Sequence, residues 1–184
     1  PICEKQNVHF RGEDRVAGTA IVPAGTFLGP PEIAIAASVG ATEVMVKKLP
    51  SVVIITSGDE LVPVEATPLP HQIRSSNVHC IATLLKPYQI EVDFIHIPDD
   101  LATTQQAIQQ ALQQYDVLIL CGGVSQGKKD FIPKALQAEG VHKHFHKLGQ
   151  QPGKPFWFGR KGRNVVFALP GNPVSSFLCA RRYF

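Results

Sequence analysis

The chain has 184 residues, of which 44% are hydrophobic and 18% are charged, and its formal net charge is +3. This balance predicts a folded globular chain with room for one full domain and part of another. The lysines and arginines are dispersed, which argues against a nucleic-acid partner but suits small anions. No apolar run reaches the roughly 18 residues of a membrane span, so we expect no membrane association and a cytoplasmic location.

Residues 1–48 have a different pattern from the rest of the chain. The expected elements are short extended pieces at residues 8–14 and 18–26, a helix from Pro30 to Ser38 that stops at Gly40, and a short strand at residues 43–47. This segment is too small to form its own core. We therefore expect it to be the C-terminal part of a preceding domain, and the whole chain to be a piece of a longer protein.

Strands and helices alternate from residue 49 onward. The expected strands are residues 52–56, 90–97, 117–121, 142–147, 155–158 and 165–169, and the expected helices are residues 76–86, 103–115, 130–139 and 172–182. The uniformly apolar strand 117–121 is typical of a central parallel strand that is covered on both faces. The order predicts that residues 49–184 form a three-layer α/β/α domain with a mostly parallel sheet.

The four cysteines are far apart and form no CxxC pair. Cys80, Cys121 and Cys179 have apolar neighbours in the sequence, which predicts reduced packing residues. The pattern around Cys3 favours no particular role.

A glycine-rich turn follows the strand 117–121. Gly122, Gly123 and Gly127 allow positive φ and let a ligand approach the backbone. Ser125 adds a hydroxyl group, and successive N–H groups in such a turn can form an anion-binding nest. A carboxylate beside such a nest, here Asp130, indicates a metal-bridged phosphate. The alternative is a plain strand-to-helix turn with a capping Asp.

Four polar loops each follow directly on a predicted strand. They are Gly58-Asp59-Glu60, Pro98-Asp99-Asp100, residues 122–127 and Pro170-Gly171-Asn172-Pro173. Ligands of open α/β sheets bind outside the carboxyl ends of the strands, so we expect these loops to converge on one crevice. The helix that starts at Asn172-Pro173 presents its positive end, which suits phosphate or another oxyanion. The alternative for this loop is a stiff turn without a ligand.

Glu60, Asp99 and Asp130 place up to three carboxylates against this anion site. Such a group requires a hard cation such as Mg²⁺, or raised pKa values. Singly, Asp99 or Asp100 could instead cap the next helix. Lys147 and Lys154 could neutralise an oxyanion, although such lysines are commonly solvated surface groups.

The row His142, His144 and His146 lies on one face of a predicted strand. Two of these side chains could bind zinc, but no further ligand is visible nearby. The pattern favours a solvated strand face.

Several motifs occur together in an order and spacing that match a known family. They are residues 7–14, Thr56-Ser-Gly-Asp-Glu-Leu61, Ser76-Asn77, residues 122–127 with Asp130, Pro152-Gly-Lys-Pro155 and Leu169-Pro-Gly-Asn-Pro-Val-Ser175. Over essentially its whole length the chain resembles the MoeA and gephyrin E-domain family of molybdopterin molybdenumtransferases.

The resemblance implies a MogA-like fold and an Mg²⁺-dependent enzyme that inserts molybdenum from molybdate into adenylylated molybdopterin and releases AMP. It implies catalytic roles for Glu60, Asp99, Asp130 and Lys147, with Asp130 and Glu60 at the metal. It also implies cofactor-binding roles for Ser57, Gly58, Gly122, Gly123, Ser125, Gly127, Lys154, Pro170, Gly171, Asn172, Pro173 and Ser175.

Two departures from the family pattern bear on these expectations. Gln151 stands where much of the family has a lysine, which removes a positive charge near the expected molybdate. The family is also longer, so residues 1–48 are expected to end its linker and dimerisation domain, and the full protein to be a homodimer. An adenylyltransferase-like enzyme and a gephyrin-like scaffold remain the alternative functions.

Overall fold

The computed structural model describes residues 3–124 and 131–184. The chain divides into two compact units, Pro1–Lys48 and Leu49–Phe184. Among the described helices, none combines the length and the apolar character of a membrane span.

The larger unit is built on a six-stranded sheet whose described strands have the order β4-β1-β5-β8-β7-β6. The strands are β1 (Val52–Ser57), β4 (Val92–Ile97), β5 (Val117–Cys121), β6 (His142–His146), β7 (Trp157–Lys161) and β8 (Asn164–Leu169). Neighbours among β4, β1, β5 and β8 pair in parallel, whereas β7 and β6 add antiparallel pairs at one edge. The prediction of a mostly parallel sheet is confirmed.

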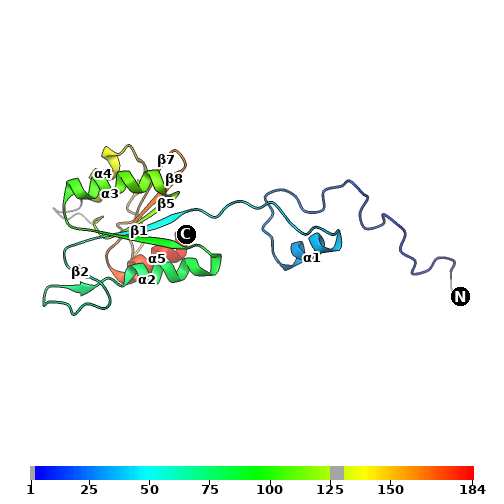
Figure 1. Ribbon diagram of the computed structural model, residues 1–184, viewed down its shortest axis with the longest axis horizontal. Helices are drawn as coiled ribbons and strands as arrows, with labels where there is room; N and C mark the ends of the chain where they lie inside the picture. The colour runs from blue at the N-terminus through cyan, green and yellow to red at the C-terminus, as the bar shows by residue number, and fades with distance from the viewer. Residues whose placement is uncertain (1–2, 125–130) are drawn as a thin grey trace. The chain divides into compact units, whose positions relative to one another are not determined.

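Helices cover both faces of this sheet (Figure 1). They are α2 (Asn77–Leu85), which continues into the 3₁₀ turn η1 (Lys86–Tyr88), α3 (Leu101–Gln114), α4 (Ile132–Ala138) and α5 (Pro173–Tyr183). Val53 of β1 packs in one hydrophobic cluster with Ile108 of α3 and Leu136 of α4. Its neighbour Ile54 packs in a second cluster with Ile81 of α2 and Cys179 of α5. Because successive side chains of a strand point to opposite faces, the three-layer α/β/α prediction is confirmed.

The structure contains two short strands that the sequence does not predict. β2 (Leu61–Val62) and β3 (Ile73–Arg74) pair in parallel. Ile73 N donates to Glu60 O at 2.8 Å, and Ser75 N donates to Val62 O at 2.9 Å. Alternation cannot be detected in a strand of two residues, and the connection between them is rich in proline. The pair matters because it brings the residues before α2 beside Glu60.

One predicted strand is displaced. Residues 155–158 were expected to be extended, but β7 occupies Trp157–Lys161. Phe156 N donates to Gly153 O at 3.3 Å, so the chain is still turning there. The next two elements, β8 and α5, begin within one residue of their predicted starts. The predicted helix start at Asp130 lies outside the described residues.

The smaller unit contains the predicted helix but not the predicted strand. α1 spans Pro30–Ser38, and the Glu32 carboxylate accepts a hydrogen bond from Gly29 N at 2.9 Å. Residues 43–47 form no strand, so that prediction is wrong, and residues 8–14 and 18–26, expected as extended pieces joined by turns, consist of turns, bends and irregular backbone. A strand needs a partner, and no described residue of this unit supplies one. That residues 1–48 end a preceding domain stays a prediction.

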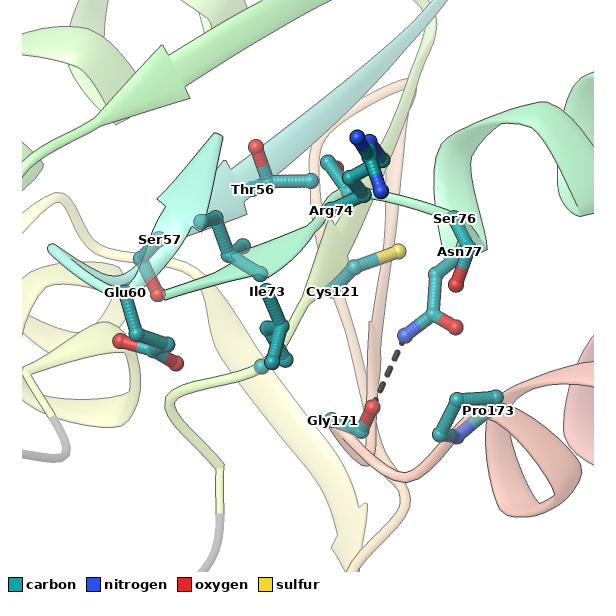
Figure 2. A pocket seen from close by; sticks show the side chains of 13 residues that line it. Thr56, Ser57, Glu60, Ile73, Arg74, Ser76, Asn77, Cys121, Gly171 and Pro173 are labelled. Atoms are coloured by element: carbon teal, nitrogen blue, oxygen red, sulfur yellow. Dashed lines mark hydrogen bonds between the residues drawn. The ribbon is translucent and has the colours of Figure 1, made fainter. Parts of the chain in front are cut away.

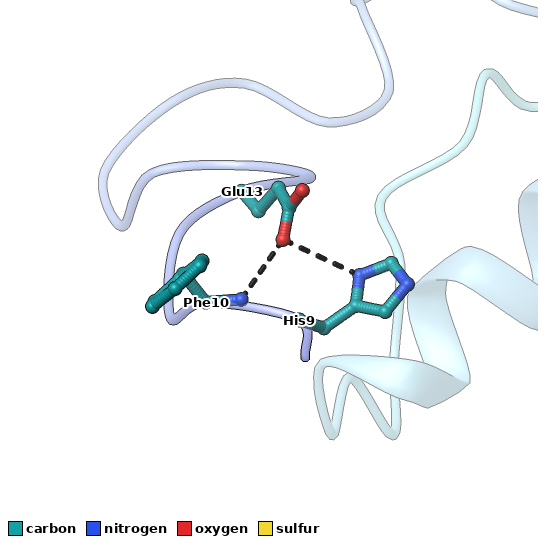
Figure 3. Close-up of polar contacts among 3 residues, drawn as sticks. All are labelled: His9, Phe10 and Glu13. Carbon is teal, nitrogen blue, oxygen red and sulfur yellow. Dashed lines mark hydrogen bonds and ion pairs between the residues drawn. The ribbon is translucent and has the colours of Figure 1, made fainter. Parts of the chain in front are cut away.

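Figure 3 shows why the segment around Phe10 turns. Glu13 N donates to Phe10 O at 3.1 Å, and Phe10 N donates to Glu13 Oε2 at 2.8 Å. His9 Nδ1 lies 3.6 Å from the same carboxylate oxygen in an exposed pair. These bonds close a turn between Phe10 and Glu13 in place of an extended segment.

The cysteines and the histidine row behave largely as expected. Cys80, Cys121 and Cys179 are free and half-buried or buried, which confirms the packing interpretation. His142 and His144 are exposed on β6, which confirms a solvated face there, whereas His146 is half-buried with Nε2 3.3 Å from the Val124 carbonyl oxygen. The described residues contain no group of three His, Cys, Asp or Glu side chains placed to hold a metal ion.

α3 begins at an acidic cap. The Asp100 carboxylate accepts hydrogen bonds from Thr103 N and Thr103 Oγ1, both at 2.7 Å. The backbone bond, and then the hydroxyl bond, hold the pKa of Asp100 below its ordinary value of 3.8. Of the two predicted candidates, Asp100 is therefore the cap.

We predict that Asp100→Asn keeps the cap but removes its pH dependence. Because the pKa is lowered by folding, the charged cap stabilises the protein above the ordinary pKa of 3.8. That contribution is lost as the pH falls through the folded pKa. Thermal unfolding should show the wild type to be more stable than the variant near pH 7, with a smaller difference near pH 2.5. A difference that is the same at both pH values would contradict this.

Candidate functional site

Four loops at the carboxyl ends of the parallel strands line one cavity of about 460 Å³. They follow β1, β4, β5 and β8 and contribute Glu60, Asp99, Gly122 and Asn172. The chain passes from β1 to β4 at one edge of the sheet, and from β5 to β6 at the opposite edge, from which it returns through β7 to β8. The cavity thus lies where the direction of the strand connections reverses, which is the usual ligand position in open α/β sheets.

A smaller cavity of about 230 Å³ adjoins the first, and Ser57, Glu60, Gly122 and Gly171 line both. Figure 2 shows side chains around the smaller cavity that come from β1, β3, β5 and the start of α2. The two cavities therefore form one crevice with two compartments.

Two glycines are required by the close approach of the chain to its own side chains. Gly58 has φ 137°, and a Cβ atom there would lie 2.6 Å from Glu60 Oε2. Gly123 has φ 61°, and a Cβ atom there would lie 2.9 Å from Ile132 Cδ1 and 3.0 Å from Ser57 Oγ. Any other residue would be strained at either position and would displace a neighbour. The absence of a side chain at Gly58 thus leaves room for the Glu60 carboxylate beside its own loop.

Among the described residues, the acidic side chains that line the larger cavity are those of Glu60 and Asp99. Their loops are bonded to each other, because Asp99 N donates to Asp59 Oδ1 at 3.2 Å and Gly58 N donates to Ile97 O at 3.4 Å. Asp59 thus connects the loops after β1 and β4. The result is an acidic region at one part of the crevice, with carboxylate oxygens of the type that hard cations prefer.

The start of α5 brings partial positive charge to the same cavity. Asn172 Oδ1 accepts a hydrogen bond from Ser175 N at 3.1 Å and so caps the helix. Pro173 occupies the first helical position. Pro170, Asn172 and Ser175 line the larger cavity. The positive end of the α5 dipole therefore lies at the same cavity as the carboxylates, where it favours an anion.

The two predicted lysines lie in the hairpin between β6 and β7. Lys147 N donates to Phe156 O at 2.9 Å, and Leu148 N donates to Lys154 O at 2.8 Å. Both lysine side chains are exposed, and neither lines the two cavities, whereas Pro155 lines the larger one. Their role at an oxyanion stays a prediction.

Gln150 attaches this hairpin to α5. Its Oε1 accepts a hydrogen bond from the Tyr183 hydroxyl at 2.7 Å, and its Nε2 lies 3.3 Å from Cys179 Sγ. The next residue, Gln151, is exposed. The hairpin is therefore attached to the C-terminal half of α5, while Gln151, which stands where much of the resembling family has a lysine, faces solvent.

Three predicted site residues, Ser125, Gly127 and Asp130, lie outside the described residues. The anion nest that was expected across the glycine turn is therefore described only at Gly122 and Gly123, whose φ angles are 95° and 61°. Both line the larger cavity together with Ser57 and Gly58.

Cys121 lines the smaller cavity but is not poised as a nucleophile. Burial raises the pKa of its thiol to about 12. The reactive form of cysteine is the thiolate, and it is scarce at neutral pH when the pKa is this high. The described part of the crevice thus favours binding and electrostatic stabilisation over covalent catalysis through Cys121.

The smaller cavity has a wall, formed by Arg74, Ser75 and Asn77, that the sequence does not predict. Ser76-Asn77 belongs to a motif of the resembling family, but the motif by itself indicates no role for these residues. The available signal was the start of a helix directly after the proline-rich connection. The pairing of β2 with β3, which places this start at the crevice, is not visible in the sequence.

Known proteins share this fold and much of this sequence. A family model described as "probable molybdopterin binding domain" matches residues 53–184. A molybdopterin molybdenumtransferase of Synechocystis sp. is 39% identical over 180 residues, which are 96% of this chain and 46% of the relative. The protein of the same name from Staphylococcus aureus is 32% identical over 178 residues, 96% of this chain and 42% of the relative.

Solved structures agree with the sequence comparison. The molybdopterin biosynthesis MoeA protein of Pyrococcus horikoshii superposes with a TM-score of 0.68 at 29% identity, covering 96% of this chain and 43% of that chain. A Thermus MoaB structure shares the fold at 17% identity, with a TM-score of 0.55 over 70% of this chain and 86% of that chain. This chain spans less than half the length of the curated relatives that it matches. Because the family model covers the whole sheet from Val53 onward, the chain belongs to the molybdopterin-binding domain family.

Proposed function

We propose that this chain is the molybdopterin-binding part of an enzyme of molybdenum cofactor biosynthesis. The full protein takes adenylylated molybdopterin and molybdate, inserts molybdenum into the dithiolene and releases AMP. The observation that carries the proposal is the cavity of about 460 Å³, which carboxylate-bearing loops and a helix N-terminus line together. Membership of the molybdopterin-binding family and the names of its curated relatives support this choice of ligand and reaction.

The residues of the larger cavity suit a ligand that carries both a phosphate and a bound cation. Gly122 and Gly123 let the ligand approach the backbone, and Asn172 and Ser175 present the positive end of α5 to an anionic group. Glu60 and Asp99 supply negative charge to the same cavity. An anionic ligand is accommodated beside carboxylates when a cation lies between them.

Mg²⁺ is the cation in this proposal, and the residues present fit it. Glu60 and Asp99 bring hard oxygen ligands to one cavity, and Mg²⁺ is commonly held by one or two carboxylates together with substrate phosphates and water. Bound there, Mg²⁺ would neutralise phosphate charge as AMP departs. Asp130 joins this group through the family resemblance alone.

Lys147 and Lys154 are proposed to attract molybdate from the solvent side of the crevice. They lie on the hairpin that contributes Pro155 to the larger cavity, and this hairpin is anchored to α5 through Gln150. Exposed lysines favour an approaching oxyanion electrostatically without being part of a closed pocket. A cytoplasmic, homodimeric full-length protein completes the proposal.

Binding of purified molybdopterin to the chain, with and without Mg²⁺, tests the proposal by titration calorimetry. We expect measurable affinity that increases with Mg²⁺. Glu60→Gln and Asp99→Asn, and likewise Asp130→Asn, should lower the Mg²⁺-dependent part by about tenfold, because each removes one charge from the cation site.

Glu91→Gln is the matched control, because Glu91 is an exposed carboxylate that lines neither cavity. It should leave the affinity unchanged. No binding by the wild-type chain would contradict the proposal, and transfer of an adenylyl group from ATP to molybdopterin would favour the adenylyltransferase alternative.

We predict that Gly58→Ala weakens Mg²⁺-dependent binding by about tenfold or more. A methyl group at this position collides with the Glu60 carboxylate and must push it out of its place, and the residue also has positive φ. The Mg²⁺ titration of the variant measures the effect. Gly162→Ala is the control, since Gly162 also has positive φ but no atom within 4 Å of its Cβ position. Equal losses in both variants would show that backbone strain alone is responsible.

Gln151→Lys should increase the attraction of the crevice for molybdate. The residue is exposed in the same hairpin as Lys154, so a new positive charge there acts through solvent. A gain of roughly two- to fivefold in molybdate affinity is expected at low salt, and it should fade as the ionic strength rises. Complementation of a molybdenum-cofactor mutant with the full-length gene, wild type against variant, provides the functional readout. An unchanged or lower molybdate affinity would place Gln151 away from the oxyanion.

A further inference from the structure

A side-chain hydrogen bond joins the start of α2 to the loop before α5. Asn77 Nδ2 donates to Gly171 O at 2.9 Å, although the two residues are 94 positions apart in the sequence (Figure 2). Asn77 is the first residue of α2, and it lines the smaller cavity. Gly171 lines both cavities. The bond therefore spans the wall that the two compartments of the crevice share.

The loop from Pro170 to Asn172 has few polar groups with which to hold itself in place. Pro170 and Pro173 carry no backbone N–H group. The Asn172 side chain is already used to cap Ser175. At the start of the loop, Gly122 N donates to Leu169 O at 3.1 Å. Asn77 thus supplies a second, side-chain anchor at the middle of the loop.

The shape of the two cavities depends on the position of Gly171. A Cβ atom at Gly171 would lie 3.7 Å from Gly122 Cα, so the loop passes the glycine turn after β5 with room for little more than one methyl group between them. A small outward movement of Gly171 would separate it from this turn and change the shape of both cavities. A binding surface that is ordered before the ligand arrives loses less free energy on binding.

We infer that Asn77 is a positioning residue whose bond to Gly171 O holds the shared wall of the crevice in its binding shape. This inference rests on the proposed function, since the ligand concerned is molybdopterin. Gly171 is exposed, so water can replace the bond when Asn77 is removed. The loss then falls on ligand affinity and leaves the stability of the fold nearly unchanged.

Asn77→Ala is the first test, with the Mg²⁺-containing molybdopterin titration as the readout. We expect affinity to fall about three- to tenfold, the range for the net loss of one hydrogen bond. The thermal unfolding midpoint should remain close to that of the wild type. Hydrogen exchange at the Gly122 amide, which donates to Leu169 O at the base of the loop, should become faster, because the loop has lost its second anchor.

Asn77→Asp distinguishes the effect of the lost hydrogen bond from any effect on the start of α2. A carboxylate in the first turn of α2 is favoured by the helix dipole, so the helix is retained. It cannot donate to Gly171 O, and it adds a charge near an anionic ligand. The loss of affinity should therefore be at least as large as in Asn77→Ala. If only the Asp variant binds weakly, charge rather than the bond is responsible, and the inference is overturned.

Thr83→Ala is the matched control on the same helix. Thr83 Oγ1 donates to His79 O at 2.7 Å, so this variant also loses one side-chain bond to a carbonyl group, but it lines neither cavity. Its affinity for molybdopterin should equal that of the wild type. An equal loss in Thr83→Ala, or full affinity in Asn77→Ala, would overturn the inference. Absence of binding by the wild type would instead reject the proposed function itself.

Discussion

The parallel pairing of β1 with β5, and of β5 with β8, is the constraint on which the crevice depends. The registers place Thr56 beside Cys121 and Cys121 beside Leu169, so the three strands end at the same level. Side chains of β1 alternate between two buried clusters, and a slip of one residue would exchange them. The strands are therefore locked in this register, and the loops that follow them must emerge side by side.

The crevice combines this rigid base with polar, partly exposed loops. Residues at the strand ends such as Thr56 and Cys121 are buried, whereas Glu60 and Asn172 are exposed. Hydrogen bonds beyond the strand ends connect the loops to one another. Gly122 N donates to Leu169 O, and Asn77 Nδ2 donates to Gly171 O. A buried scaffold that carries exposed loops is the usual arrangement of binding sites, because the scaffold holds groups that the solvent would otherwise keep mobile. This arrangement brings the acidic residues close to the N-terminal end of α5, although the two lie far apart in the sequence.

Apolar runs and helix-start motifs in the sequence correctly predicted most of the elements of the larger unit. The apolar run from Val117 to Cys121 identified a strand buried on both faces, and Asn172-Pro173 identified a helix start that the capping bond to Ser175 explains. The predictions that were wrong concern segments whose conformation depends on a partner. Residues 43–47 have the composition of a strand, but the described residues of their unit offer no strand to pair with.

The sequence by itself determined the layered α/β architecture and the loops that contribute Glu60, Asp99 and Asn172, because periodicity and caps express interactions between residues a few positions apart. It also determined the family, through several different motifs that occur along the chain in the order and spacing typical of that family. Only the tertiary structure decided that β2 pairs with β3, that Lys154 lies outside the two cavities, and that Asn77 reaches Gly171. These features depend on the packing of segments distant in the chain, and a contact across 94 positions leaves no periodic or local trace in the sequence.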